Sequence, residues 1–152
     1  MTRSLPGLSR DIALLIARVA LAVIMAAHAW QKLFVTGISD TAVLFHKFGI
    51  PLAILAASFT IVVEFAASAL LVIGWQVPVA GSFLVFVMVG AIVFVHGSKG
   101  IFVSDGGWEL VGVIIAATLG LMATGPGRIS LDHLLASNRV REAALIRRPV
   151  TV

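Results

Sequence analysis

Residues 12–34 read IALLIARVALAVIMAAHAWQKLF, an apolar run whose main polar residues are Arg18, His28 and Lys32. An α-helix rises about 1.5 Å per residue, and about 20 apolar residues cross the roughly 30 Å hydrocarbon core of a bilayer. The run is therefore long enough to span a membrane. It is too long for the apolar part of a signal peptide, and no small-residue cleavage pattern follows Lys32. We interpret it as a retained transmembrane helix.

The rest of the chain repeats this pattern in three further apolar runs, at residues 50–74, 78–96 and 108–124. Of the 152 residues, 60% are hydrophobic and 12% are charged, whereas soluble domains carry about 25% charged residues. We predict an all-α membrane protein built as a four-transmembrane-helix bundle. This domain would span residues 1–127, with helices at about 12–34, 50–74, 78–96 and 108–124, and residues 128–152 would form a basic cytoplasmic tail.

The same composition excludes several classes of protein. There is no cysteine, which argues against a disulfide scaffold, a thiol redox enzyme and a cysteine-ligated metal site. The apolar content argues against a soluble enzyme domain. The net charge of +4 comes from residues near the chain ends, where a topology signal would place them, so we expect no nucleic-acid partner.

The segments between the runs carry turn residues. Residues 36–49 and 97–107 contain glycines and charged side chains, and we predict both as loops on the same face of the membrane. Residues 74–78 form a short connection between two helices. The segment 132–142 has two interpretations, a short helix on the inner leaflet or a frayed basic tail, and the sequence leaves both open.

The distribution of cations gives the orientation. Positively charged residues accumulate on the cytoplasmic side of membrane proteins. The two predicted loops contribute only Lys47 and Lys99, whereas the chain ends carry seven arginines. We therefore expect both termini in the cytoplasm of a multi-pass protein of the cell (inner) membrane, on the side marked by Arg3, Arg10, Arg128, Arg139, Arg141, Arg147 and Arg148.

Ionisable residues inside the apolar runs are the most informative part of the sequence. A charge in the middle of a transmembrane helix costs about 2.5–3.5 kcal/mol on insertion scales, so such residues usually face the bundle interior and have a partner or a function. The candidates for a polar site are Arg18, His28, Lys32, Glu64, His96 and Glu109.

Helical spacing places these residues on inward faces. Arg18 and Lys32 are two heptads apart, so they share one face of the first helix. In the last helix we expect the stripe Glu109, Gly112, Ala116 and Gly120 to turn inward in the same way. We predict that Arg18 reaches up to Glu64, and that a ring at the outer end surrounds a site with Glu64 at its floor. The ring consists of His28, Lys32, His96 and Glu109.

This cluster has two interpretations. In the first, two cations and two carboxylates neutralise one another and fix the helix register, with no further role. In the second, they form a site open to the outer face, where histidines beside carboxylates move protons near neutral pH or hydrogen-bond a quinone carbonyl or an anionic head group. Two histidines, His28 and His96, are a weak signal for metal or haem, and we expect no metal.

The chain also resembles the DoxX family of small four-helix membrane proteins from about Arg10 to Asp132. The family pattern begins with an arginine, here Arg18, and continues with His-Gly-x-x-Lys-Leu. It then has a glutamate in the second helix, here Glu64, a histidine ending the third, here His96, and an aromatic-Glu-Leu opening the fourth. The corresponding motifs here are His28-Ala29-Trp30-Gln31-Lys32-Leu33, with alanine in place of glycine, and Trp108-Glu109-Leu110.

The most specific match is the exit motif Gly-x-Gly-Arg-x-Ser-Leu-Asp. Here it reads Gly125-Pro126-Gly127-Arg128-Ile129-Ser130-Leu131-Asp132. It also has a mechanical interpretation, in which Asp132 or Ser130 caps a following helix and Arg128 marks the cytoplasmic boundary.

The resemblance implies a function more loosely than a fold. It implies a membrane subunit of a quinone-linked oxidoreductase system that acts with a separate redox partner, binds quinone non-covalently and carries no covalent cofactor. A non-enzymatic accessory or assembly protein is the first alternative, and a small transporter is the second. The lipid bilayer is the expected surroundings in every case, and the oligomeric state stays open.

Overall fold

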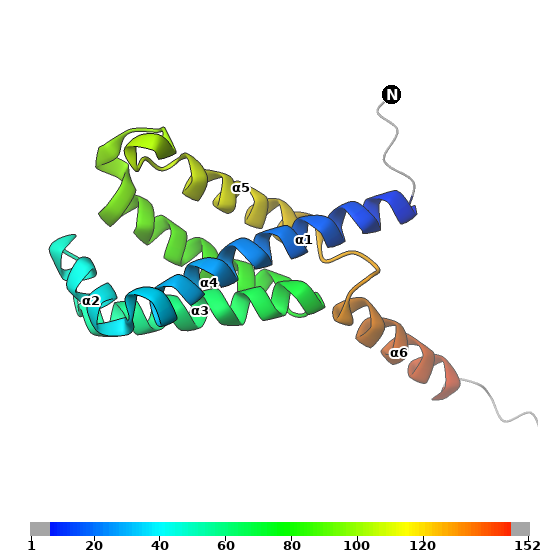
Figure 1. Cartoon of the computed structure of the whole chain (residues 1–152). Coiled ribbons are helices and arrows are strands. Elements are labelled where there is room, and N and C mark those ends of the chain that lie inside the picture. The colour runs from blue at the N-terminus through cyan, green and yellow to red at the C-terminus, as the bar shows by residue number, and fades with distance from the viewer. Residues whose placement is uncertain (1–6, 147–152) are drawn as a thin grey trace, which may run out of the picture.

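The computed structural model describes residues 7–146, and the side chains of residues 7–139. Six α-helices lie in this part of the chain (Figure 1). They are α1 (Gly7–Trp30), α2 (Ile38–Lys47), α3 (Ala53–Ile73), α4 (Val77–Ala91), α5 (Glu109–Thr124) and α6 (Leu131–Ile146). Short turns of other helical types join them: the π-helical turns η1 (Gln31–Thr36) and η2 (Ile92–His96), and the 3-10 turns η3 (Gly97–Lys99) and η4 (Val103–Asp105).

Three helical stretches are long and apolar enough to cross a membrane. They are Gly7–Thr36, Ala53–Ile73 and Val77–Lys99. A fourth apolar helix, Glu109–Thr124, is shorter. Many large apolar side chains on these stretches point outward, for example Val62, Phe86 and Val113. Such a surface suits hydrocarbon rather than water, because soluble monomers rarely expose contiguous apolar patches of this extent.

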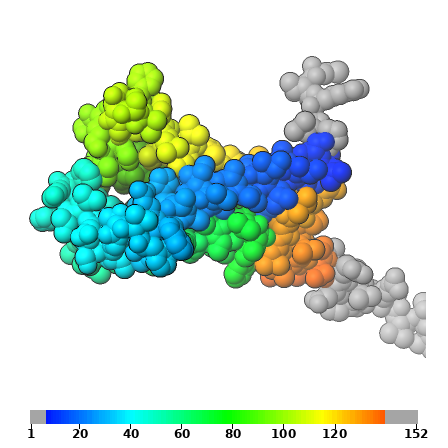
Figure 2. Space-filling model, viewed as in Figure 1, coloured from blue at the N-terminus to red at the C-terminus, as the bar shows by residue number. Residues whose placement is uncertain are grey.

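The helices pack as two pairs that meet at one end. α1 lies along α3, and α4 lies along α5. The ends nearest α6 are close together, whereas at the other end α2 and the segment after α4 lie apart (Figure 1). In the space-filling view these two segments form separate lobes, cyan and yellow-green (Figure 2). We call this the open end, and the end nearest α6 the closed end.

At the closed end, side chains pack directly against two glycines. The turn between α3 and α4 passes through Gly74, whose φ of 67° is the left-handed conformation that favours glycine. A Cβ at Gly74 would overlap the guanidinium of Arg18 and the side chain of Ser130. At Gly81 in α4, a Cβ would press against Met122 and Thr118 of α5. A larger residue at either position would therefore force a neighbouring side chain to shift where the helices touch.

The structure departs from the sequence predictions in two places and decides between two alternatives in a third. Residues 36–49 were predicted as a loop, but they contain α2. The segment 132–142, for which the sequence left two interpretations open, is helical within α6, and its location on the inner leaflet stays a prediction. The stripe on α5 was predicted to face inward, but Ala116 and Gly120 are exposed. Of the arginines used for orientation, Arg3, Arg147 and Arg148 lie outside the described residues, as does the side chain of Arg141.

Candidate functional site

An ion pair joins the first and second long helices. Lys32 lies in η1, at the end of α1, and its Nζ is 2.6 Å from Oε1 and 2.7 Å from Oε2 of Glu64 in α3. The Glu64 side chain is 1% exposed and that of Lys32 is 24% exposed. The carboxylate is thus fully enclosed, while the lysine reaches toward open space. π-helical turns such as η1 are frequent at functional sites.

A cavity of about 700 Å³ occupies the open end, between the two helix pairs. This volume lies within the range of about 300–1,000 Å³ that is usual for small-molecule sites. Four of the six candidate residues line it: His28, Lys32, Glu64 and His96. Most of the remaining wall is apolar. The sequence analysis placed five residues around one site, and the structure brings these four of them together at the cavity.

The two histidines that line the cavity differ in their hydrogen bonds. Nδ1 of His96 lies 2.7 Å from the carbonyl oxygen of Gly106. Because a carbonyl only accepts, Nδ1 carries the proton and donates, which leaves Nε2 of the neutral ring as a free acceptor. His28 makes no hydrogen bond with any residue that the structure describes. Both rings therefore keep a nitrogen available for a ligand.

Phenylalanines form much of the apolar wall, and from the sequence alone Phe86 and Phe94 were interpreted as ordinary packing residues. α2 contributes Phe45, and Phe48 follows directly after it. The face of α2 toward the cavity consists of Thr41, Leu44, Phe45 and Phe48, which have the spacing i, i+3, i+4 and i+7 of one helix face. This period is the signal that the loop prediction overlooked. α3 and α4 add Phe59 and Phe86, and η2 adds Phe94.

Arg18 does not reach Glu64, so that prediction is wrong. Its guanidinium turns toward the closed end, where Nη1 donates to the carbonyl of Leu71 at 3.3 Å and Nη2 donates to that of Ile129 at 2.5 Å. The residue is fully buried, and its Nε has no hydrogen-bond partner among the described residues. Arg18 therefore ties α1 to the end of α3 and to the segment after α5.

Glu109 does not belong to the cavity either. Its Oε1 accepts a hydrogen bond from the backbone N–H of Val103 at 2.9 Å, and the residue is absent from the cavity wall. The loop between α4 and α5 leaves backbone donors without helical partners, and Glu109 satisfies one of them. The predicted ring at the outer end therefore loses this member.

The chain is similar to known proteins over most of its length. Residues 13–97 match the family model described as DoxX. The chain belongs to the DoxX family. The Escherichia coli (strain K12) protein named "Inner membrane protein YphA" is 32% identical to it over 141 residues, which cover 84% of this chain and 93% of YphA. No solved structure matches.

The DoxX match contains the four residues of the cavity but ends before Glu109 and the exit motif. This DoxX protein is a multi-pass integral membrane protein, as its long apolar helices and its relative indicate. The described residues contain no cluster of three or more His, Asp or Glu side chains arranged to hold a metal ion.

In this DoxX protein the exit motif forms turns and hydrogen bonds at the closed end. Gly125 and Gly127 have φ values of 76° and 80°, which turn the chain back under the bundle. Ser130 Oγ accepts from the backbone N–H of His133 and so caps α6. Asp132 Oδ2 instead accepts from the N–H of Gln76, in the turn between α3 and α4.

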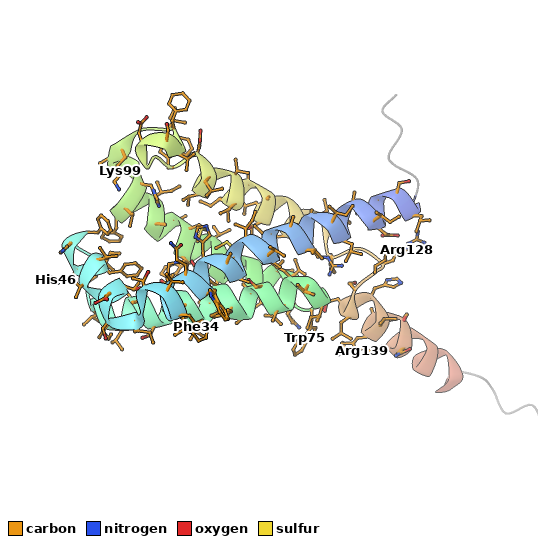
Figure 3. All side chains as sticks on the ribbon, in the orientation of Figure 1. Phe34, His46, Trp75, Lys99, Arg128 and Arg139 are labelled. Atoms are coloured by element: carbon orange, nitrogen blue, oxygen red, sulfur yellow. The ribbon has the colours of Figure 1, made fainter. Side chains whose placement is uncertain are left out.

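Arg128 completes this arrangement at the start of α1. Its Nε donates to Oδ2 of Asp11 at 2.6 Å, and its backbone N–H donates to Oδ1 at 3.0 Å (Figure 3 labels Arg128). The exit motif is thus hydrogen-bonded to the start of α1 and to the turn between α3 and α4, and its Ile129 accepts from Arg18. These contacts lie at the closed end, outside the cavity wall.

Proposed function

We propose that this chain is a quinone-binding membrane subunit of an oxidoreductase system, and that a separate redox protein supplies the electrons. In this proposal α1, α3, α4 and α5 all cross the membrane, both termini lie in the cytoplasm, and the cavity opens toward the outer face. The observation that carries it is the cavity itself. It has an apolar wall, and its ionisable groups are His28, His96 and the Lys32–Glu64 pair.

These groups suit a planar ring with carbonyl acceptors. A quinone head is apolar apart from its carbonyl oxygens, so it needs an apolar pocket with a few donors. The Lys32 ammonium has three N–H donors. Both oxygens of Glu64 contact it, yet the Lys32 side chain stays 24% exposed. His28 has no partner among the described residues and is free to donate.

The histidines also provide a route for protons. Two-electron reduction of a quinone to a quinol takes up two protons, and imidazole exchanges protons near neutral pH. The hydrogen bond between Nδ1 of His96 and the carbonyl of Gly106 holds the ring in one orientation. It therefore also fixes the position of the second ring nitrogen, Nε2. Electrons have no carrier among the side chains of this cavity, so the proposal assigns their transfer to the partner.

A pair of glycines offers a test that leaves every polar group in place. A Cβ added at Gly90 in α4 meets nothing within 4 Å, and Gly90 lines the cavity. Gly120 in α5 is equally unobstructed but lies outside the cavity. The variant Gly90→Leu should therefore occupy cavity space, while Gly120→Leu serves as the matched control.

The measurement is equilibrium binding of a tritiated quinone to purified protein in lipid nanodiscs. We expect Gly90→Leu and His28→Ala each to weaken binding at least about tenfold, equivalent to about 1.4 kcal/mol, and Gly120→Leu to bind as the native chain does. Equal binding by Gly90→Leu and the native chain would place the quinone elsewhere and refute the proposal, as would the absence of saturable binding.

An accessory role is the second candidate, because α5 turns small residues outward. Ala116 and Gly120 are exposed, and small residues spaced by four allow close contact with another transmembrane helix. In this role the chain would stabilise a partner membrane protein. The variant Gly120→Leu would then lower the abundance of the co-purifying partner while quinone binding stays unchanged. A partner level that is insensitive to Gly120→Leu excludes this surface.

A further inference from the structure

The cavity also borders the lipid-facing side of the molecule, between α3 and α4. Phe59 of α3 and Phe86 of α4 meet there edge to face, with ring centroids 6.1 Å apart and an interplanar angle of 83°. Both rings line the cavity. The same two rings line a separate groove of about 320 Å³ on the outside, together with Ser82 and Phe83. The aromatic pair is therefore the partition between cavity and groove.

We infer that Phe59 and Phe86 gate a lateral passage, and that the groove beyond them holds the hydrocarbon tail of a ligand whose head lies in the cavity. This inference rests on the proposed function and deepens it: the ligand class becomes quinones with a long isoprenoid tail, which arrive from within the bilayer rather than from water.

The chemistry of the groove supports a hydrocarbon occupant. Its walls are three phenylalanines and Ser82. The hydroxyl of Ser82 donates to the carbonyl of Pro78 at 2.8 Å, within its own helix, so it makes no demand on an occupant. A groove of this kind offers nothing to a polar head group, and it favours the burial of methylene groups.

The geometry of the partition allows it to open. A single edge-to-face contact is a weak attraction. Phe59 is 40% exposed and Phe86 is 67% exposed, so neither ring is held by a surrounding core. A change in side-chain rotamer of either ring would join the cavity and the groove into one channel, without moving the backbone of α3 or α4.

A second opening, at the open end, has a different character. There Lys99, in the segment after α4, places its ammonium 5.5 Å from the ring centroid of Phe48, which follows α2, so this contact bridges the two lobes at one point. The exposed Lys47 and Asp105 lie on the same two lobes. His46 lies at the outer end of the α2 lobe, and Lys99 lies on the other lobe (Figure 3). A water-soluble quinone without a tail can use this opening, whereas a long tail cannot cross it without leaving hydrocarbon.

The absence of cysteine in the chain makes this difference testable. The double variant Phe59→Cys/Phe86→Cys is reconstituted in nanodiscs and treated with a short bifunctional methanethiosulfonate, which closes the partition reversibly. The association rates of two tritiated quinones are then measured, one without a tail and one with a long isoprenoid tail. The variant Phe34→Cys, treated with the same reagent, is the control, because Phe34 is 61% exposed and lines neither space.

We expect cross-linking to slow association of the long-tailed quinone at least about tenfold, dithiothreitol to restore it, and the tailless quinone to be unaffected. If the cross-linked protein takes up the long-tailed quinone at the unmodified rate, or loses both quinones equally, the lateral passage is refuted while quinone binding stands. If neither quinone binds the native chain, the proposed function is refuted together with this inference. Should the double variant fail to fold, Phe86→Trp narrows the partition and must produce the same selective slowing.

Discussion

Lys32 holds both carboxylate oxygens of Glu64, at 2.6 and 2.7 Å, across the contact between η1 and α3. The two side chains differ in exposure, since Glu64 is 1% exposed and Lys32 is 24% exposed. The pair neutralises the one carboxylate on α3, and it ties the end of α1 to that helix at the border of the cavity. Because one charge is enclosed and the other is not, the two partners should respond differently to substitution.

Removing the lysine should cost more than removing the carboxylate. The variant Lys32→Met leaves a buried unpaired charge at Glu64, which lowers the free energy of unfolding by about 3–5 kcal/mol. The variant Glu64→Gln leaves an ammonium that can extend toward water, so its loss should be smaller. Denaturation in detergent micelles, followed by tryptophan fluorescence, measures both. Equal losses would contradict the asymmetry, and the double variant Lys32→Met/Glu64→Gln should recover part of the stability lost in Lys32→Met.

Helical spacing placed His28, Lys32, His96 and Glu109 around Glu64, and four of these five residues line the cavity. It could not assign the partner of Glu64, because Arg18 and Lys32 are two heptads apart and lie on the same face of the first helix. The assignment depends on Ile129, whose carbonyl receives Arg18 at the closed end. That contact joins residues 111 positions apart, and no local pattern reveals it.

The open end was harder to predict from sequence for a different reason. α2 has ten residues, too few to span a bilayer, and its charged residues resemble those of a loop. Glu109 has the spacing of an inward residue, yet the unpaired N–H of Val103 recruits it. The π-helical turns that carry Lys32 and His96 likewise leave no signature in the apolar pattern. At the open end, local hydrogen-bonding requirements of the backbone therefore set side-chain positions that helical periodicity did not predict.

Gly74 should be far less tolerant of substitution than Gly49. Both have left-handed φ values, 67° and 76°, so replacement by alanine costs each of them about 1–2 kcal/mol in backbone strain. A Cβ at Gly49 meets nothing within 4 Å, whereas one at Gly74 overlaps the guanidinium of Arg18. We expect Gly74→Ala to lower the melting temperature well beyond Gly49→Ala, as measured by thermal unfolding in micelles. Similar melting temperatures would show that Arg18 is not packed against this turn.

The two roles of His96 can be separated by its substitutions. The bond from Nδ1 to the carbonyl of Gly106 holds the loop between α4 and α5. The variant His96→Asn can still donate to that carbonyl, whereas His96→Ala cannot. Amide hydrogen exchange over residues 97–107 should therefore accelerate in His96→Ala and stay close to native in His96→Asn. Quinone binding should weaken in both variants, because neither restores the second ring nitrogen. Native binding by His96→Asn would limit His96 to its structural role.

Asp11 should matter more to the closed end than Arg128, although the two form one ion pair. The carboxylate accepts from both the Nε and the backbone N–H of Arg128, and the Arg128 side chain is 61% exposed. In Arg128→Gln the backbone bond to the buried Asp11 remains, and the ion pair that is lost has its cation exposed to solvent, so the loss should be small. In Asp11→Ala both bonds are lost, and the turn through Gly127 loses its link to α1. Hydrogen exchange at residues 125–131 should rise sharply in Asp11→Ala, slightly in Arg128→Gln and little in Asp11→Asn, which keeps an acceptor for the N–H.

Since salt screens exposed charges, raising the salt concentration should remove the small effect of Arg128→Gln and leave that of Asp11→Ala. A larger effect in Arg128→Gln than in Asp11→Ala would mean that the charge, rather than the backbone bond, holds the exit motif in place.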